Sequence, residues 1–292
     1  MPELPEVETI TRDLKKGVLE RTFLDVWTDW EKTIKKPKDF AIFKKEIKGK
    51  KIEKIFRRGK NILFELSGDK TLLVHQKLTG HLLLGKWEKK DKAWKPVSPG
   101  PLEDPMNRFL HLIFWLDDEK QLALSDLRKF AKVELWDTKA LMDSEGIKSL
   151  GPDPLSKFFT FEKFLGILRS RKGKIKQVLL NQTVIAGIGN IYSDEILFAA
   201  KIHPFQETSK ITLQELKRIY KAMREVLKDA VALRGESISD YRDLSGRKGN
   251  FDKIRKVYRR EKEKCPRCKN PIKRVKIGGR SAHYCPNCQK LR

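Results

Sequence analysis

The residues with the most reactive chemistry stand at the start of the chain, in the run Met1-Pro-Glu-Leu-Pro-Glu-Val-Glu-Thr9. If Met1 is removed, which a small second residue permits, the chain begins with the secondary amine of Pro2 beside the carboxyl group of Glu3. An α-amine has a pKa of about 8, so part of it is neutral and nucleophilic at physiological pH. Such an amine can attack a masked aldehyde to form an iminium while the neighbouring acid moves the protons. The alternative is a frayed terminus in which proline only opens a helix.

A second group of reactive side chains lies near the other end of the chain, in the motif Cys265-x2-Cys268-x16-Cys285-x2-Cys288. Two Cys-x2-Cys pairs at this distance are typical of a four-thiolate zinc site with a tight knuckle at each pair. Four thiolates leave no open coordination position, so we expect one structural Zn²⁺ rather than a catalytic metal. A redox role is the alternative. The sequence Gly278-Gly-Arg280 would turn a hairpin between the pairs and place an arginine beside the turn.

A glycine-punctuated motif, Gln182-Thr-Val-Ile-Ala-Gly-Ile-Gly-Asn-Ile-Tyr192, precedes a helix that we expect to begin near Asn190. Backbone N–H groups at such a helix start form an anion site, and the side chain of Asn190 could add a donor. The motif lacks the Lys-Ser/Thr of a nucleotide-binding P-loop, and no strand is predicted before it. The alternative is a helical-hairpin turn that binds no ligand.

Basic residues outnumber acidic ones, with 64 Lys and Arg against 39 Asp and Glu and a formal net charge of +25. Residues 265–292 contain Lys and Arg but neither Asp nor Glu, whereas the first ten residues contain Glu3, Glu6 and Glu8 and no base. Lysine enrichment also accompanies thermostability. This uneven distribution, however, favours a nucleic-acid-binding protein that keeps its carboxylates for chemistry.

The sequence gives no sign of export or of a membrane segment. The N-terminus is acidic and lacks an apolar core, and the longest apolar stretch, Phe109–Leu116, is too short to cross a bilayer. All cysteines lie in the C-terminal cluster, which leaves none for disulfides elsewhere. We therefore expect an intracellular, cytoplasmic protein with no membrane contact, associated with the nucleoid if it is bacterial.

The elements that must position these residues change in character near the middle of the chain. Apolar residues spaced by three and four predict a helix over 5–19. Short runs rich in branched and aromatic residues predict a series of strands typical of a sandwich or barrel. These runs cover 22–27, 51–56, 61–66, 72–75, 81–87, 109–116, 121–124 and 131–136. The Lys- and Pro-rich stretch Trp87–Arg108, called the insertion below, is expected to be a surface loop.

The breaker Gly151-Pro-Asp-Pro154 marks the predicted domain boundary. Beyond it the apolar spacing predicts helices over 161–169, 175–180, 189–200 and 213–234. The predicted organisation is a β-rich domain over 1–150 that begins with the reactive residues, a helical domain over 151–240, a mobile loop and connector over 241–264, and a zinc finger over 265–292.

Taken together, the chain resembles the formamidopyrimidine-DNA glycosylase (Fpg) family, the Fpg branch of the Fpg/endonuclease VIII superfamily. The match covers essentially the whole chain. Its motifs are, in order, Pro2–Thr9, Arg57-Arg-Gly-Lys60, His75-x2-Leu-Thr-Gly80, Asp126-x-Arg-x-Phe130, Ile175-Lys176 through Tyr192, and Gly279–Gln289. The resemblance implies an α+β fold of two domains. An N-terminal helix with an antiparallel β-sandwich is followed by a helix-two-turns-helix domain that ends in a zinc-finger β-hairpin.

The resemblance implies a bifunctional DNA glycosylase/AP lyase of base excision repair that acts as a monomer on damaged double-stranded DNA. Pro2 would attack C1′ of a flipped, oxidised purine nucleotide, such as 8-oxoguanine or a formamidopyrimidine, and form a Schiff base. Successive β- and δ-elimination would then cut the strand. Glu3 would be the acid/base, Glu6 a supporting carboxylate and Lys60 a further catalytic residue. Flipping is needed because C1′ cannot be reached while the base is stacked.

Two further sets of residues are implied by the resemblance. Four phosphate-clamping residues of the family match Lys60, His75, Asn190 and Arg280, and Lys176 is a further DNA contact. Alone, Lys60 would be one strand-edge lysine among many and His75 a half-buried strand histidine. Phosphate contacts of this kind supply much of the affinity for DNA and make it depend on salt.

The three residues that fill the gap left by the everted base match Leu78, Arg128 and Phe130. Leu78 replaces a methionine of similar volume, so we expect gap filling to survive with an altered tolerance for the opposite base. Lys129 stands where a second arginine is usual, which keeps a cation but removes a bidentate fork.

Residues Gly235–Gly249 match the loop that covers 8-oxoguanine in Fpg enzymes, with Ser237-Ile-Ser-Asp-Tyr241 as its stem. Two other functions remain open: an endonuclease VIII-like glycosylase for oxidised pyrimidines, and a non-catalytic, zinc-dependent binder of DNA damage or of RNA. The intact Arg128-x-Phe130 counts against the first, and the retained Pro2-Glu3 against the second. The insertion has no role that the resemblance assigns.

Overall fold

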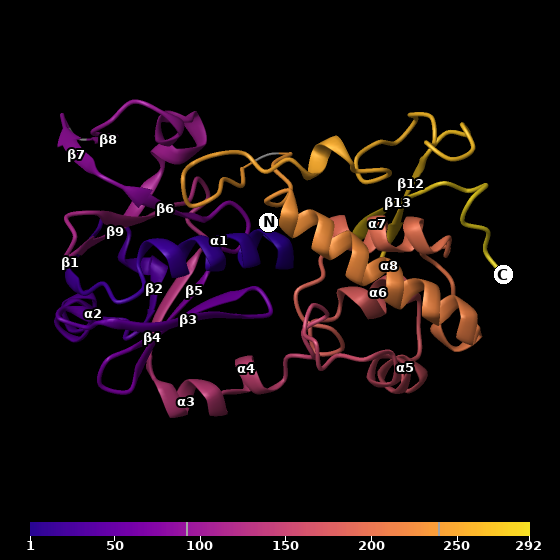
Figure 1. Ribbon diagram of the computed structural model, residues 1–292, viewed down its shortest axis with the longest axis horizontal. Coiled ribbons are helices and arrows are strands. Elements are labelled where there is room, and N and C mark those ends of the chain that lie inside the picture. The colour runs from indigo at the N-terminus through magenta and orange to yellow at the C-terminus, as the bar shows by residue number, and fades with distance from the viewer. Residues whose placement is uncertain (92, 239) are drawn as a thin grey trace. The chain divides into compact units, whose positions relative to one another are not determined.

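The computed structural model describes residues 1–91, 93–238 and 240–292, and Figure 1 shows their helices and strands. Position 92 of the insertion and position 239 of the expected loop stem lie outside the described residues. The chain forms two compact units, the first from Met1–Lys148 with Leu233–Asp252 and the second from Ser149–Ala232 with Lys253–Arg292. Residues 241–252 of the expected connector are therefore part of the first unit.

The first unit contains helix α1 (Leu4–Gly17), a four-stranded sheet and a five-stranded sheet. The four-stranded sheet is antiparallel and has the order β1 (Phe23–Thr28), β9 (Leu110–Leu116), β10 (Gln121–Ser125), β6 (His81–Gly85). The five-stranded sheet has the order β2 (Ile34–Lys36), β11 (Lys132–Asp137), β5 (Lys70–His75), β4 (Asn61–Leu66), β3 (Ile52–Arg58). Only the short β2–β11 pair among these described strands is parallel.

The core of this unit lies between α1 and the inner faces of the strands. Val7, Ile10 and Leu14, on one face of α1, are fully buried and pack with apolar side chains from both sheets. Burying a side chain of this size stabilises the fold by about 1.5–3 kcal/mol, so the spacing that predicts the helix also fixes it against the sheets. The predicted α+β fold, with its N-terminal helix and β-sheets, is confirmed.

The insertion lies largely at the surface, as expected, but the prediction that it is a loop is wrong. Strands β7 (Trp87–Lys90) and β8 (Ala93–Pro96) form a hairpin, and the 3₁₀ turns η2 (Pro101–Glu103) and η3 (Pro105–Arg108) follow it. The ring of Trp94 packs against Trp27 and Trp115, with centroids 5.2 and 6.0 Å apart. The loop prediction relied on the many Lys and Pro residues and gave no weight to Trp94, whose ring contacts anchor the insertion to the four-stranded sheet.

Three short helices, α2 (Phe40–Ile47), α3 (Thr138–Asp143) and α4 (Glu145–Lys148), were not predicted. Helices α3 and α4 are shorter than two turns, and α2 at eight residues barely exceeds two turns, so apolar spacing gives little signal for any of them. The side chain of Asp39 caps α2 by accepting the N–H of Ile42 at 3.0 Å, which is the local signal that could have located this helix.

The second unit contains α5 (Phe161–Arg169), α6 (Ile175–Leu180), α7 (Asn190–Ala200), α8 (Leu213–Ala232) and a hairpin of β12 (Lys273–Ile277) and β13 (Arg280–Tyr284). The predicted helices over 161–169 and 175–180 match their observed bounds, and the predicted hairpin is present. Helix α7 is buried along most of its length and packs on α8. Phe198 of α7 also contacts Val257, Ile272 and two of the cysteines, which seats the terminal module on this helix.

None of the helices in the described part of the chain is long and apolar enough to cross a membrane.

Candidate active site and nucleic-acid interface

Met1 is exposed, whereas Pro2 and Glu3 are buried at the start of helix α1. Pro2 is buried within the first unit, and Glu3 and Glu6 are only 2% and 1% exposed. Glu3 is the N-cap of α1, and its backbone N–H donates to Glu6 Oε2 at 2.7 Å. This bond is one half of a capping box, and the helix dipole also stabilises a carboxylate in the first turn. The two acids therefore have fixed positions beside Pro2.

The second oxygen of Glu6 reaches a distant part of the chain. Glu6 Oε1 accepts the backbone N–H of Glu236 at 2.8 Å. Gly235 precedes this contact with a φ of +82°, and a Cβ on it would lie 2.7 Å from Glu6 Oε1. Only glycine satisfies both the left-handed backbone and the close approach. The carboxylate of Glu6 thus joins the helix start to the Gly235–Gly249 segment.

Lys60 and His75 lie at the ends of neighbouring strands in the five-stranded sheet. Lys60 follows Gly59, which has a φ of +60° in the β3–β4 turn. Lys60 is 9% exposed. His75 ends β5, and its Nδ1 accepts the N–H of Lys77 at 3.0 Å, so the proton of the neutral ring is on Nε2. Burial, and then the charges of Lys77, Lys132 and Lys60, lower the pKa of His75 from 6.5 to about 3. At neutral pH this ring is an uncharged N–H donor.

Asp126 organises the turn that carries the predicted gap-filling arginine and phenylalanine. Its Oδ2 accepts the N–H groups of Phe130 and Ala131, both at 2.7 Å. Its Oδ1 accepts the N–H of Arg128 at 3.2 Å and the hydroxyl of Thr79. This buried carboxylate therefore holds the turn and also joins it to the preceding turn at residues 75–80.

The residues predicted to fill the gap lie on these two joined turns. Leu78 is half-buried on the first, and Phe130 is 51% exposed on the second. The guanidinium of Arg128 lies 4.8 Å from the centre of the Phe130 ring, so the two side chains stack. Lys129, between them, has a φ of +57° and places its ammonium 4.6 Å from the ring of Trp30. Lys129 thus points to a different neighbour from the stacked pair.

Lys176, expected among the DNA contacts, has a completely buried side chain. Its ammonium donates to Asp194 Oδ1 and, at 2.7 Å, to the carbonyl oxygen of Ser281. Asp194 Oδ2 lies 2.9 Å from both the backbone nitrogen and Nδ1 of His283. In this conformation Lys176 joins α6, α7 and β13 from inside the second unit, and direct contact with a ligand at the surface is excluded by its burial.

Asn190 and Arg280 meet through the same strand. Asn190 is the first residue of α7, and its Nδ2 lies 3.4 Å from the hydroxyl oxygen of Ser281, next to Arg280 in β13. The Gly278-Gly279 turn before Arg280 has φ values of +53° and +74°, and a Cβ on Gly278 would lie 2.4 Å from the side-chain nitrogen of Gln177. The glycines therefore let the hairpin turn sit against α6 and leave Arg280 exposed.

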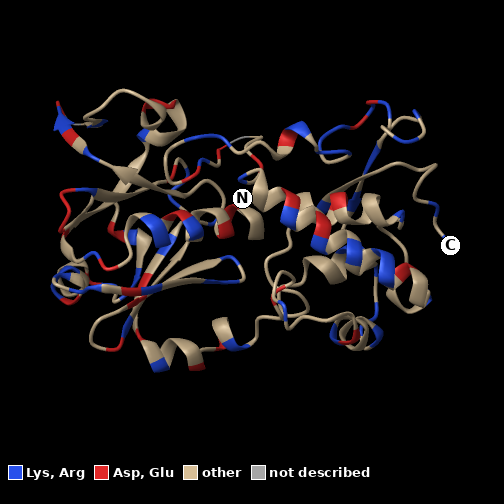
Figure 2. Cartoon of the chain, viewed as in Figure 1, with Lys and Arg blue, Asp and Glu red and all other residues tan. Residues whose placement is uncertain are grey.

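The surface around Arg280 is basic. Figure 2 shows Lys and Arg on β12, the partner strand of Arg280, and Lys273, Arg274 and Lys276 there are all exposed. Asn190 Oδ1 is buried and has no hydrogen-bond partner among the described residues. An amide at a helix start beside exposed cations suits a polyanion backbone.

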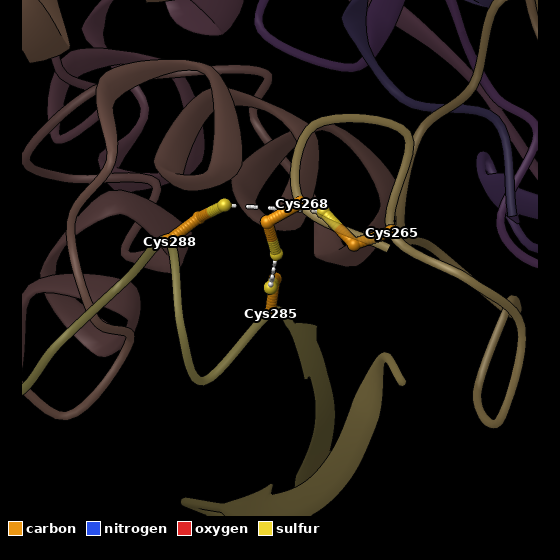
Figure 3. A group of neighbouring side chains, drawn as sticks. All are labelled: Cys265, Cys268, Cys285 and Cys288. Carbon is orange, nitrogen blue, oxygen red and sulfur yellow. Dashed lines mark hydrogen bonds between the residues drawn. The ribbon is translucent and has the colours of Figure 1, made fainter. Parts of the chain in front are cut away.

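The four cysteines converge on one point, as Figure 3 shows. Their sulfur atoms all lie within 4.8 Å of one another, with 3.9 Å between Cys265 and Cys288 and 3.4 Å between Cys268 and Cys285. Tetrahedral zinc with Zn–S bonds of about 2.3 Å needs sulfur atoms about 3.8 Å apart, so the donor set and its geometry fit this ion. Four sulfur ligands complete the coordination, and the metal is structural.

The structure assembles the predicted residues into groups within each unit. The first unit contains the start of the chain (Pro2, Glu3, Glu6), the strand-end pair (Lys60, His75) and the joined turns (Leu78, Arg128, Lys129, Phe130). The second contains Asn190, Lys176 and Arg280 around Ser281, and the cysteine cluster. Sequence reasoning missed Thr79, Gly235 and Asp194. Thr79 and Gly235 belong to motifs of the resemblance, but no role was predicted for them. The signal that could have indicated Asp194 is an acidic residue within an otherwise apolar predicted helix.

Three family models match the chain in order. They are the formamidopyrimidine-DNA glycosylase N-terminal domain over residues 1–133, the formamidopyrimidine-DNA glycosylase H2TH domain over 150–242, and the zinc finger found in FPG and IleRS over 262–291. Fold, basic surface and zinc hairpin together define the class of this protein as a DNA-repair glycosylase with a structural zinc finger.

Individual relatives identify the family. The formamidopyrimidine-DNA glycosylases of Pelotomaculum thermopropionicum and Bacillus cereus are 41% and 36% identical, over 100% and 99% of both chains. The Lactococcus lactis Fpg in complex with abasic-site DNA has a TM-score of 0.84 at 35% identity and covers 99% of both chains. An Fpg mutant of that species with Fapy-dG-containing DNA scores 0.85 at 35% identity and covers 99% of this chain and 100% of its own. The chain belongs to the formamidopyrimidine-DNA glycosylase family.

We predict that His75 remains neutral, with its proton on Nε2, throughout the range from pH 5 to pH 8. Its folded pKa of about 3 lies below this range, because burial and three neighbouring cations disfavour the imidazolium. NMR of ¹⁵N-histidine-labelled protein measures both the tautomer and the titration, and a His75→Gln variant assigns the resonance. An apparent pKa between 6 and 7 would contradict the structure.

We predict that chelating the zinc abolishes DNA binding while the first unit stays folded. The metal holds the hairpin that carries Arg280, and the zinc cluster and its packing lie within the second unit. All six tryptophans lie between residues 27 and 136, so their fluorescence reports the first unit alone. Release of one Zn²⁺ per chain, lost binding and an unchanged emission maximum are expected. Full binding by a variant with all four cysteines changed to serine would refute the zinc argument.

Proposed function

We propose that this chain excises oxidised purines, 8-oxoguanine and formamidopyrimidines, from duplex DNA and then cuts the strand, with Pro2 as the nucleophile once Met1 is removed. The observation that carries the proposal is the burial of Pro2, Glu3 and Glu6 at the start of α1. Glu3 is held by Glu6 at the first turn of α1, and Pro2 lies directly before it. A frayed terminus would leave both residues exposed.

The chemistry follows from these groups. The lone pair of the Pro2 nitrogen forms a bond to C1′ as the bond from C1′ to the base breaks and the base leaves with a proton. The sugar ring then opens between C1′ and O4′, giving an iminium, while Glu3 supplies the proton to O4′. Loss of a proton from C2′ expels the 3′ phosphate by β-elimination, and a second elimination expels the 5′ phosphate. The zinc takes no part because its coordination is complete.

DNA contacts are proposed for four polar side chains, two in each unit. Lys60 and Arg280 are proposed to attract phosphates as cations, and His75 and Asn190 to donate neutral hydrogen bonds that fix them. Lys176 supports this surface from beneath, because it holds the carbonyl of Ser281 beside Arg280. Removing one member of a buried ion pair lowers the stability of the fold by about 3–5 kcal/mol. Loss of Lys176 would therefore disturb the position of β13, and Lys176 acts on DNA binding through that strand.

The stacked pair of Arg128 and Phe130 suits the space left by an everted base. An exposed aromatic ring can wedge into a base step and bend the duplex, while the guanidinium reaches the orphaned partner base. Leu78, on the turn that Thr79 joins to Asp126, adds apolar volume beside them. Lys129 contacts Trp30 in this structure, and a phosphate contact would require it to leave that ring.

The decisive experiment is borohydride trapping on duplex DNA with 8-oxoguanine opposite cytosine, using protein whose N-terminus is verified by mass spectrometry. We expect a covalent adduct at Pro2. Glu3→Gln should slow base excision about a hundredfold or more, because general acid–base catalysis contributes this much, while DNA binding is retained. Glu20→Gln, at an exposed acid beyond the end of α1, is the matched control.

Two outcomes of this experiment would refute the proposal. Tight binding of damaged DNA with no adduct and no product would leave a non-catalytic damage binder. Adducts confined to duplexes with oxidised pyrimidines, in a panel of lesions, would indicate an endonuclease VIII-like specificity instead.

We also predict that Arg128→Ala weakens discrimination of the base opposite the lesion more than it weakens total binding. Loss of a good contact to a base edge removes about 1–3 kcal/mol of discrimination. Arg108→Ala is the matched control, because its guanidinium also stacks on a neighbouring ring, 5.0 Å from the centre of Phe109. Excision rates opposite each of the four bases measure the effect, and equal losses against all four would contradict this role.

A further inference from the structure

The insertion contacts the Gly235–Gly249 segment through an ion pair. Asp104, between the two 3₁₀ turns, accepts from Arg242 Nη2 at 2.9 Å. The arginine side chain is only 4% exposed, and its Nη1 donates to the carbonyl of Tyr241 at 2.9 Å. A charge-assisted bond to a largely buried guanidinium is stronger than a surface ion pair, which gives this contact a defined geometry.

A second, independent contact lies beside it. Asn107 is 1% exposed, and its Nδ2 donates to the carbonyl oxygens of Pro101 at 2.9 Å and Gly246 at 3.1 Å. Its Oδ1 lies 3.0 Å from Nε2 of His81 in the four-stranded sheet. Gly246 has a φ of +83°, and a Cβ on it would lie 2.6 Å from Asn107 Nδ2. The segment is therefore shaped to receive this asparagine.

The contacted segment also reaches the proposed catalytic acids. At its start, Glu236 donates its N–H to Glu6, which in turn holds the N–H of Glu3. Within the segment, the hydroxyl of Ser237 donates to the carbonyl of Tyr241 and accepts the N–H of Gly249. These bonds fix the two ends of the segment, so a change at Asp104 or Asn107 loosens the part between them and leaves the bond from Glu236 to Glu6 in place.

We propose that Asp104 and Asn107 are positioning residues through which the insertion holds the Gly235–Gly249 segment in place and so sets the rate of base excision. This inference rests on the proposed function. It assigns a role to the insertion that does not require it to touch DNA. Cleavage at an abasic site uses the same amine and acid, but no base has to be held during it. Comparing it with excision of a damaged base therefore distinguishes an effect on holding the base from an effect on the reacting groups.

The test compares Asp104→Asn and Asn107→Ala with the wild type in single-turnover experiments. Asp104→Asn keeps the shape but removes the charge that pairs with Arg242, and Asn107→Ala removes the donor to Gly246. We expect excision of 8-oxoguanine to slow about tenfold or more, since misplacement of a site by a distant change has effects of this size. Cleavage of a duplex that already contains an abasic site should change less than twofold. Asp104→Glu should restore part of the excision rate.

Glu88→Gln is the matched control, because Glu88 is an exposed acid of the same insertion and pairs only with Lys90 among the described residues. Amide hydrogen exchange supplies a readout independent of activity: residues 240–249 should exchange faster in both variants and normally in the control. Equal slowing of both reactions, or no change in either, would overturn the proposal. A wild-type protein inactive on both duplexes would remove the proposed function itself, which the variants cannot do.

Discussion

The carboxylate of Glu6 is the constraint on which the first unit depends. A buried ionised carboxylate is strongly destabilising unless its oxygens receive hydrogen bonds. Backbone N–H groups of Glu3 and Glu236 supply such bonds, so the start of the chain and a segment near residue 235 must both come to the same point. The position of the reactive terminus, the glycine at 235 and the route of the chain back into this unit all follow from that requirement.

The second unit solves the same problem with a different carboxylate. Asp194 is buried in α7, where Lys176 neutralises it and His283 occupies its other oxygen. The result is a rigid seat for β13, and therefore for Arg280, made from groups that are not themselves exposed. In both units a buried acid determines where a functional residue stands, and in neither does that acid need to meet the substrate.

Prediction from sequence succeeded where the chemistry is encoded locally. The cysteine spacing predicted the cluster, and apolar spacing predicted α1, α5 and α6. The resemblance supplied Lys60, His75 and the turns at residues 75–80 and 126–130, which the structure assembles within one unit, and their roles toward DNA stay predictions. It could not supply partnerships between distant residues: Arg242 is 138 positions from Asp104, and nothing in either local sequence indicates the pair. The resemblance placed Lys176 among the DNA contacts, and nothing in its local sequence indicates that Asp194 lies beside it in the fold.

The bond between Glu6 and Glu236 spans 230 positions, and this has a consequence for synthesis. A protein leaves the ribosome N-terminus first, and domains generally fold as they emerge. Here the first unit cannot close around its own terminus until residues up to Asp252 have been made, by which time the helices of the second unit already exist. The nascent chain therefore carries an incomplete version of the proposed reactive centre for most of its translation. Competence to act on DNA arrives late, almost together with the zinc hairpin.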